Sequence, residues 1–220
     1  MSDLLASLGL EFVNPNAVTK GLKALKPSDE PQIFSVISSI PGLENTVIRY
    51  QQHDFFNQIK RKIRCSGGAC CQKAKDLGEW LNTLPDDDLR KRQRPYAQTR
   101  LIIPVVLYQG KTIQAYGGPI EVRYINIADA IYNEWDSARS AVNEDIAPFY
   151  QRDFIMTSKP NMKGVPVMTH TESKAKWLTD PAINAEVMKI VSDPEFINNY
   201  VKIVPARLDE QEFLGMWNAA

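Results

Sequence analysis

The sequence predicts an α+β fold in which a small β-barrel is flanked by helices. The first observation is a run of three strand-like segments within residues 99–125, separated by two glycine-containing turns. The second is the recurrence of apolar residues at helical spacing on either side of that run, in residues 72–84 and 127–142. Short strands in a meander, interrupted by a helix, are typical of a five-stranded barrel of the OB type.

The N-terminal part of the chain is expected to be a helix and an arm. Residues 3–10 have the pattern of a short helix. The polar arm that follows contains Lys20, Lys23 and Lys26 but few hydrophobic residues, so we expect it to be held loosely. Residues 33–40 alternate weakly and fit either a short strand or a helical turn.

Two strands and a helix are expected next. Residues 46–50 have the composition of a strand, and residues 55–64 would form a second strand with one wholly cationic face. A tight turn then leads into a helix over residues 72–84. The cationic face would consist of Lys60, Lys62 and Arg64, and the opposite face of Arg61 and Ile63.

The rest of the chain continues with strands and then helices. Asn126 is the expected N-cap of the helix that follows the meander. The tail from residue 181 is expected to be helical. The expected strands of this part are residues 99–108, 112–116, 120–125, 154–157 and 165–169.

These elements predict three segments. The first is an N-terminal helix and arm in residues 1–31. The second is an OB-type core in residues 32–170, with a small subdomain around residues 53–84 that contains the three cysteines of the chain. The third is a helical segment in residues 171–220.

The overall charge of zero hides a segregation of charge along the chain. Residues 49–100 contain twelve Lys and Arg against six Asp and Glu, a net charge of +6. Residues 121–155 contain three Arg against seven Asp and Glu, a net charge of −4. A neutral chain with a basic face can bind a polyanion, although such segregation is equally compatible with a solvated surface that has no partner.

The composition argues against secretion and against a membrane span. No apolar run approaches the roughly 18 residues that a spanning helix needs, and the first residues have no basic region or cleavage site. Three cysteines, an odd number, do not suggest a disulfide framework. In a reducing compartment they suggest free thiols or metal ligands, so we expect a cytoplasmic protein without a membrane partner.

The cysteines and one histidine have the composition of a zinc site. Eleven residues separate His53 from Cys65, and four separate Cys65 from the adjacent Cys70 and Cys71. The glycine pair between the cysteines lets the backbone fold back, so the thiolates can converge with a histidine from the preceding strand on a tetrahedral ion. The spacing is not that of a standard CxxC pair. Three buried cysteines packed beneath the tryptophan of the next helix are the alternative.

A basic stretch leads directly into the apolar run of the central strand. Residues 90–100 contain five cations and Tyr96, and residues 101–107 are apolar. In single-strand binding, cations neutralise phosphates and aromatic rings stack on bases. Any one tyrosine, taken alone, is better explained as a core or rim residue. The candidate DNA-binding residues are Lys60, Arg61, Lys62, Arg64, Arg90, Lys91, Arg92, Arg94, Tyr96, Arg100, Tyr108, Tyr116, Arg123 and Tyr124.

Motifs of enzymes are missing from the sequence. It contains no G-x-G-x-x-G, G-x-x-x-x-G-K-[ST], H-E-x-x-H or G-x-S-x-G pattern. The run of residues 86–88, three aspartates, has the chemistry to hold Mg²⁺, but a solvated loop that ends a helix is the better interpretation. We therefore expect a protein that is not an enzyme and has no catalytic residues.

The order of these features resembles the core of the T-even-type bacteriophage single-stranded DNA-binding protein family. The basic segment with a tyrosine that leads into an apolar strand matches residues 90–108, and the strand that leads into a helix with an Ile-Tyr pair matches residues 121–135. The family's zinc subdomain uses one histidine and three cysteines, and the four residues described above occur here in that order. The resemblance covers roughly residues 46–157, half of the chain.

The resemblance implies a sequence-independent single-stranded DNA-binding protein of phage DNA replication, recombination and repair, located in the cytoplasm of the infected bacterial host. It implies a structural Zn²⁺ ion. The implied partners are single-stranded DNA, phage replication or transcription proteins, and further copies of the chain along the DNA.

Three departures from the family pattern qualify this expectation. The family's Cys-x-x-Cys is here Cys70-Cys71, which leaves open whether both ligate. Residues 20–28 match the family's basic N-terminal arm only loosely, and the acidic tail is reduced to Asp209, Glu210 and Glu212. A zinc-containing phage structural or adaptor protein, or a DNA-binding transcription factor, is the alternative, and a nuclease that uses the aspartate run is a distant third.

Overall fold

The computed structural model describes residues 22–112, 115–160 and 162–219. The expected helix at residues 3–10 lies outside this part of the chain, as does Lys20. The described residues form two compact units, the first from residues 49–100 and 202–219, the second from residues 22–48 and 101–201. These boundaries differ from the three expected segments, because the C-terminal part of the chain contributes to both units.

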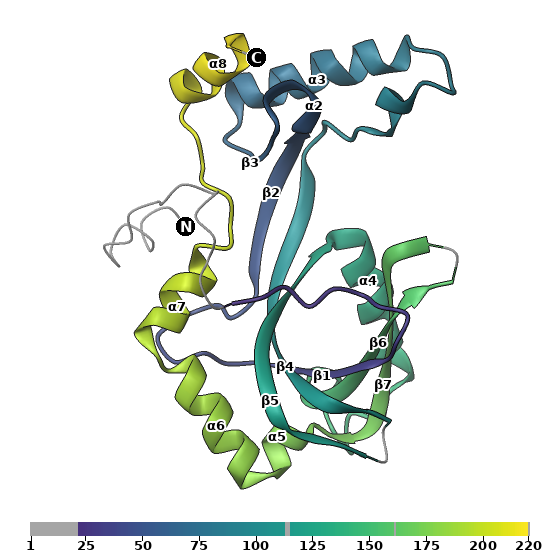
Figure 1. The fold of residues 1–220 in the computed structure, drawn as a ribbon, viewed down its shortest axis with the longest axis vertical. Coiled ribbons are helices and arrows are strands. Elements are labelled where there is room, and N and C mark those ends of the chain that lie inside the picture. Colours follow the sequence, from purple (N-terminus) through teal and green to yellow (C-terminus); the bar gives the residue numbers. More distant parts are fainter. Residues whose placement is uncertain (1–21, 113–114, 161, 220) are drawn as a thin grey trace. The chain divides into compact units, whose positions relative to one another are not determined.

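In the described part of the chain seven strands form one open sheet, and the pairs β1–β4, β1–β6, β2–β3 and β6–β7 are antiparallel (Figure 1). The strand order is β3-β2-β4-β1-β6-β7, and β5 pairs with β4. The mixed α+β class is confirmed, whereas the five-stranded OB-type barrel is not. The strands are β1 Gln32–Val36, β2 Ile48–Phe55, β3 Arg61–Arg64, β4 Gln98–Thr112, β5 Ala115–Ala128, β6 Arg152–Lys159 and β7 Met162–Lys174.

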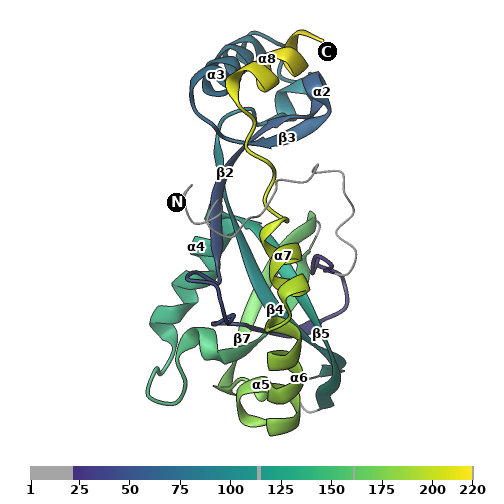
Figure 2. The same ribbon diagram turned by 90° about the vertical axis from the view of Figure 1, so that its left-hand side faces the viewer.

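Helices accompany the sheet in both units. In the first unit α3 contacts α8, and α2 contacts α8 as well, so that the three helices lie together (Figure 2). No helix in the described part of the chain is long and apolar enough to cross a membrane. The α-helices are α2 Phe56–Ile59, α3 Gly68–Asn82, α4 Asp129–Ser137, α5 Lys176–Thr179, α6 Pro181–Val191, α7 Pro194–Val201 and α8 Glu210–Asn218, and the 3-10 helices are η1 Leu89–Arg92, η2 Ala138–Ala141 and η3 Phe149–Gln151.

The single strand expected at residues 55–64 is instead the end of β2, the short helix α2 and the strand β3. Lys60 has a φ of 56°, in the left-handed region, and the chain reverses there. β3 then pairs with β2, so that Lys62 lies opposite Asp54 and Ile63 opposite His53. Lys62 is exposed and Ile63 is buried, as the alternation predicts, but Lys60 is not part of the strand.

The three-stranded meander expected at residues 99–125 is a hairpin of the two long strands β4 and β5. Gly110 has a φ of 112°, and a Cβ added there would lie against the backbone of Ala115. This glycine therefore permits a close approach of β4 to β5. The chain does not turn at Gly110, because this residue lies inside β4. The second predicted turn, residues 117–119, lies inside β5.

β5 also runs further than expected, which moves the start of α4. Asn126 lies in β5 and is not an N-cap, because Ile125 and Ile127 are both buried in the core and keep the chain extended. The N-cap is Ala128, which has no side-chain capping bond.

The polar arm before β1 is anchored along β5. Leu22 and Leu25 are buried, and the backbone N–H of Leu25 donates to the carbonyl of Tyr124 at 2.7 Å. The N–H of Tyr124 donates in turn to the carbonyl of Lys23 at 3.2 Å. The expectation of a loosely held arm is wrong for these residues, since two leucines supply the anchor.

The core of the second unit is aromatic. Phe34 of β1 stacks on Phe154 of β6 with ring centroids 5.5 Å apart, and the Trp135 ring of α4 lies edge-on to Phe154 at 4.8 Å. The buried Tyr200 of α7 donates its hydroxyl to the carbonyls of Thr46 and Ile102, at 2.6 and 3.0 Å. The aromatic pairs stabilise beyond the area they bury, and the hydrogen bonds of Tyr200 fix α7 on this unit.

The core of the first unit is smaller and lies between β2, β3, α3 and α8. Phe55 of β2 is fully buried, and its ring lies 5.7 Å from Phe213 and 5.2 Å from Trp217, both of α8. The other buried members of this cluster are Ile63, Cys70, Ala74, Leu77 and Leu81. This core holds the elements from which the candidate site is built.

Candidate metal centre and nucleic-acid interface

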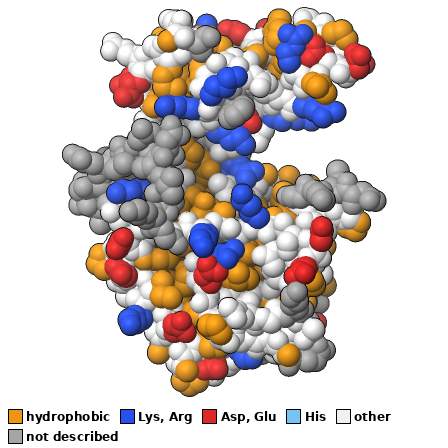
Figure 3. All heavy atoms as spheres, in the orientation of Figure 1, with side chains coloured by type: hydrophobic (Ala, Val, Ile, Leu, Met, Phe, Trp, Pro, Cys, Tyr) orange, Lys and Arg blue, Asp and Glu red, His pale blue; other side chains and the backbone are white. Residues whose placement is uncertain are grey.

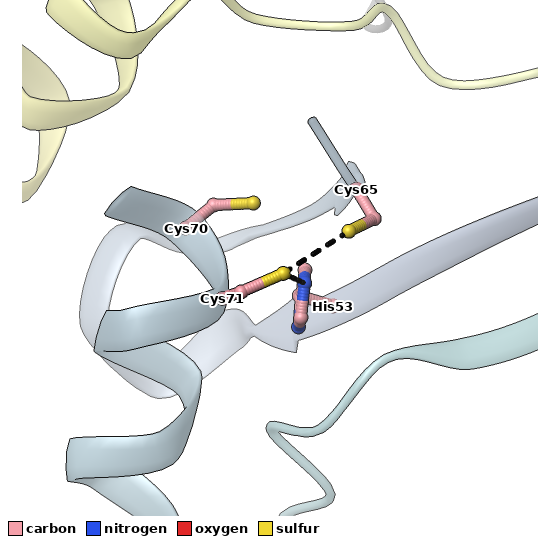
Figure 4. A group of neighbouring side chains, drawn as sticks. All are labelled: His53, Cys65, Cys70 and Cys71. Atoms are coloured by element: carbon pink, nitrogen blue, oxygen red, sulfur yellow. Dashed lines mark hydrogen bonds between the residues drawn. The ribbon is translucent and has the colours of Figure 1, made fainter. Parts of the chain in front are cut away.

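One histidine and three cysteines of the first unit point toward one another (Figure 4). His53 comes from β2, Cys65 directly follows β3, and Cys70 and Cys71 lie in the first turn of α3. Their ligand atoms all lie within 4.8 Å of one another. This His/Cys cluster is compatible with a bound metal ion, as the sequence predicts.

The glycine pair makes the convergence of the sulfurs possible. Gly67 and Gly68 have φ values of 80° and 49°, a backbone conformation that residues with a side chain rarely adopt. The chain therefore reverses tightly between Cys65 and α3. Because α3 begins at Gly68 and not at residue 72 as expected, Cys70 and Cys71 both lie in its first turn, and both sulfurs reach the cluster.

The closest contacts in the cluster involve Cys71. Its Sγ lies 3.4 Å from Sγ of Cys65 and 3.6 Å from Nε2 of His53. The Sγ of Cys70 accepts from the backbone N–H of Ser66 at 3.4 Å. Hydrogen bonds of this kind orient the ligands of a metal site.

His53 has the ring orientation of a metal ligand. It is 1% exposed, and its Nδ1 lies 2.7 Å from the carbonyl oxygen of Pro95. A carbonyl only accepts, so Nδ1 carries the proton and Nε2, which faces Cys71, has a free lone pair. Burial lowers the pKa of His53, which favours the neutral, ligating form.

Without a bound cation, the neighbouring sulfurs disfavour loss of a proton from the thiol of Cys71. Burial, and after it the hydrogen bond and the charge of Cys65, raise the pKa of Cys71 to about 12. A divalent cation among the three sulfurs reverses this balance, because it stabilises the thiolates. The three sulfurs and the imidazole nitrogen are therefore better suited to bind a soft cation than to remain without one.

The alternative interpretation, three buried cysteines beneath Trp80, does not agree with the burial. Cys70 is buried, but Cys65 is half-buried and Cys71 is exposed. Trp80 is itself 43% exposed, although its helical position predicted a core residue. The guanidinium of Arg90 lies over its ring, 5.2 Å from the centroid.

The cations expected to bind DNA lie mainly in the first unit, and several of them are exposed. Figure 3 shows Lys and Arg side chains exposed over the unit that contains α3 and α8. Lys62 makes an ion pair with Asp54 at 3.7 Å, and the side chain of Arg61 reaches the sulfur of Met216. The exposed cations are Lys60, Lys62, Arg90, Arg92 and Arg94, and the half-buried ones are Arg61, Arg64, Lys91 and Arg100.

The aspartate run pairs with the basic stretch. Asp88 binds Arg90 at 2.6 Å and accepts from its backbone N–H, and Asp86 binds Lys91 at 2.7 Å. The hydrogen bonds from Arg90 lower the pKa of Asp88 to about 2. Within the described residues the His/Cys cluster is the one group found with metal-ligand geometry, so the aspartates do not form a Mg²⁺ site there.

The four candidate tyrosines are not equivalent. Tyr96 is 51% exposed and rests on α3, where a Cβ at Gly78 would collide with its ring. Tyr108 is 3% exposed, its hydroxyl lies 2.7 Å from the hydroxyl of Ser35, and it accepts from the N–H of Trp177. This burial does not support Tyr108 as a stacking residue.

The remaining candidates belong to the second unit. Tyr116 is half-buried, and its hydroxyl donates to the buried carboxylate of Asp153. Arg123 forms an ion pair with Glu121 at 2.6 Å, and Tyr124 pairs with the arm as described above. None of these three side chains lies in the same unit as the His/Cys cluster.

No protein-family model matches the sequence, and no curated protein matches it either. The functional argument therefore rests on the residues and on their geometry.

Proposed function

We propose that the protein binds single-stranded DNA without sequence preference and that a structural zinc ion shapes its binding surface. The observation that carries this proposal is the hydrogen bond between His53 and Pro95. It ties the His/Cys cluster directly to the exposed pair Arg94 and Tyr96, a cation and an aromatic ring on either side of Pro95. Phosphate neutralisation and base stacking are the two contributions that such binding needs.

Zinc is the metal that fits the ligands best. It takes Cys₃His sets in structural sites, with bonds of about 2.3 Å to sulfur and about 2.0 Å to nitrogen, which put tetrahedral ligand atoms about 3.5 to 3.8 Å apart. The Sγ–Sγ distance of 3.4 Å and the Sγ–Nε2 distance of 3.6 Å are close to these values. A set with four protein ligands leaves no open position, so the ion would be structural and not catalytic.

The residues of the first unit have separate roles in this mechanism. Gln93 holds the basic stretch against β2 and α2, because its side-chain amide donates to the carbonyl of Asp54 at 2.9 Å and to Oε1 of Gln58 at 2.7 Å. Pro95 is buried, and Arg92 and Arg94 are exposed. The cations are therefore carried on a fixed segment, which reduces the entropy lost when they meet phosphates.

The wider role follows from the resemblance to the phage family. In that role the protein covers single strands during phage DNA replication, recombination and repair, in the cytoplasm of the infected host. Replication or transcription proteins and neighbouring copies of the chain are its partners there. The proposal needs a basic, aromatic surface, and it does not need the closed five-stranded OB-type barrel of the family.

An adaptor protein with a zinc knuckle is the competing function, and one observation favours it. Leu89 is 69% exposed directly before the basic stretch, Trp80 is 43% exposed, and large exposed apolar side chains suit a protein partner. A DNA-binding test separates the two functions.

The test is a titration of the full chain with a short oligo-dT, followed by intrinsic tryptophan and tyrosine fluorescence at two salt concentrations. A saturating quench that weakens steeply with salt is expected, because bound phosphates displace counterions. A duplex of equal length serves as the control and should bind more weakly. Absence of a quench with micromolar oligonucleotide at low salt would refute the proposed function and favour the adaptor.

A further inference from the structure

Three arginines from distant parts of the sequence are linked to one another in the first unit. Arg64 ends β3, Arg100 lies in β4, and Arg207 belongs to the segment that leads into α8. Tyr50 of β2 is 4% exposed and belongs to the strand between those of Arg64 and Arg100, while Arg207 pairs with Arg64. Arg207 is not among the residues that the sequence singles out.

Backbone pairing fixes the positions of these residues. Arg64 and Arg207 face each other in an isolated parallel β-bridge, so their side chains leave the backbone side by side. Arg64 also lies opposite Gln52 of β2, whose Oε1 accepts from the hydroxyl of Tyr50 at 3.2 Å. Arg100 makes a side-chain hydrogen bond with Tyr50.

Two of the three arginines have no acidic partner in the described part of the chain. Neither Arg64 nor Arg207 makes an ion pair there, and the guanidinium of Arg207 donates to the carbonyl of Ser66 at 3.3 Å. The neighbouring Asp209 is engaged elsewhere, because it caps α8 through the N–H of Glu212 at 2.8 Å.

The proximity of the two cations has an electrostatic cost. Burial, and after it the positive charge of Arg207, lower the pKa of Arg64. A guanidinium stays charged in proteins, so the repulsion is not relieved by loss of a proton. Arg64 is half-buried and Arg207 is exposed, and two like charges that backbone pairing holds together are stabilised when an anion lies between them.

We propose that Arg64, Arg100 and Arg207 form a binding site for backbone phosphates of single-stranded DNA. This site deepens the proposed function and rests on it. Guanidinium groups match phosphate oxygens in bidentate geometry, which a single ammonium does not. The site recognises the phosphodiester backbone alone, so its contribution is independent of the base sequence.

The site lies next to the His/Cys cluster along the chain. Cys65 follows Arg64, its N–H donates to the carbonyl of Gln51 at 2.8 Å, and Ser66 accepts from Arg207. The loop that supplies one metal ligand therefore also positions two of the three arginines.

The experiment compares Arg207→Gln with the matched control Lys189→Ala. Lys189 is an exposed cation of α6 in the second unit, without a role in the proposed site. Affinity for oligo-dT is measured at several salt concentrations. Arg207→Gln should weaken binding about tenfold at low salt, the effect of losing one charge-assisted hydrogen-bonded contact. It should also reduce the slope of log affinity against log salt by about 1, whereas the control should change neither quantity.

Two further measurements keep the test decisive. Arg207→Lys retains the charge and should keep the slope while it loses a few-fold in affinity, which a folding defect would not reproduce. A strand of abasic residues of the same length should lose the same factor on Arg207→Gln as oligo-dT does, because the bases are not involved.

The outcomes separate this site from the proposed function. If the wild type binds oligo-dT and Arg207→Gln has the same affinity and the same salt slope, the phosphate site is overturned. The proposed single-strand binding is then unaffected. A loss confined to oligo-dT and absent with the abasic strand would also overturn it, since it would indicate contacts to bases. Failure of the wild-type chain to bind either strand would overturn the proposed function.

Discussion

Replacing His53 by alanine removes a metal ligand, a buried ring and a hydrogen bond at the same time. The carbonyl of Pro95 loses its donor, and a buried group without a partner costs about 1–3 kcal/mol. If the metal is present at about a thousand times its dissociation constant, it stabilises the folded chain by about 4 kcal/mol. A hundredfold weaker site loses about 2.7 kcal/mol of that, since each factor of ten is about 1.4 kcal/mol.

The two effects together amount to roughly 4–6 kcal/mol, which approaches the whole stability of a small domain. We therefore expect His53→Ala to contain substoichiometric metal after purification without added metal and to unfold at a much lower temperature. Elemental analysis measures the first quantity and circular dichroism during heating the second. Addition of a chelator should lower the unfolding temperature of the wild type toward that of the variant and should hardly change the variant itself.

His170→Ala is the matched control. His170 is half-buried in β7, and its ring lies against Phe149 at 5.7 Å, in the second unit. Its replacement should leave the metal content unchanged. A wild type without bound metal that unfolds at the same temperature with and without chelator would show that the cluster is three free thiols and a core histidine.

Three further changes test the roles assigned to single side chains. Tyr96→Ala should weaken oligo-dT binding by the roughly 1–3 kcal/mol of one stacked base while the chain stays folded at the temperature of the titration. Tyr108→Phe should leave binding unchanged and cost about 1 kcal/mol of stability, and equal binding losses in both variants would contradict the assignment of Tyr96. Asp88→Asn releases Arg90 from its ion pair and removes a negative charge, so the affinity for oligo-dT at low salt and the salt slope should both rise. An unchanged titration would mean that Arg90 does not face DNA. Asp153→Asn weakens the buried bonds from Ser35 and Tyr116 and should destabilise the chain by about 1–3 kcal/mol in urea unfolding; wild-type stability would show that the buried carboxylate contributes nothing.

Local patterns in the sequence predicted the elements whose burial alternates regularly. Phe154 and Met156 are buried on the core face of β6, and Leu77 and Leu81 are buried on the core face of α3. The pattern failed where a glycine permits a close approach within a strand, because Gly110 in β4 has the same local sequence as a turn. It also failed at Lys60, where the tertiary pairing of β3 with β2 imposes a reversal.

The candidate site was predictable to the extent that its chemistry is local. The order of one histidine and three cysteines around a glycine pair indicated the cluster, and the structure brings their ligand atoms together. The exposure of the tyrosines was not predictable in this way. Tyr96 and Tyr108 are both near the central strand, but the partners that bury Tyr108, Ser35 and Trp177, lie 73 and 69 residues away in the sequence.

The small core of the first unit gives a physical reason for a metal ion at this place. Phe55 and Phe213 share this core with Ile63, Cys70, Ala74, Leu77 and Leu81. A small core supplies little stability, so units of this kind often need a cross-link. An ion held by β2, by the residue after β3 and by the first turn of α3 would join three elements of this unit at one point. The same ion would orient His53, and through the hydrogen bond to Pro95 it would fix the segment that carries Arg94 and Tyr96. Loss of the metal should therefore weaken DNA binding and stability together, whereas a loss of stability alone would separate the cluster from the binding surface.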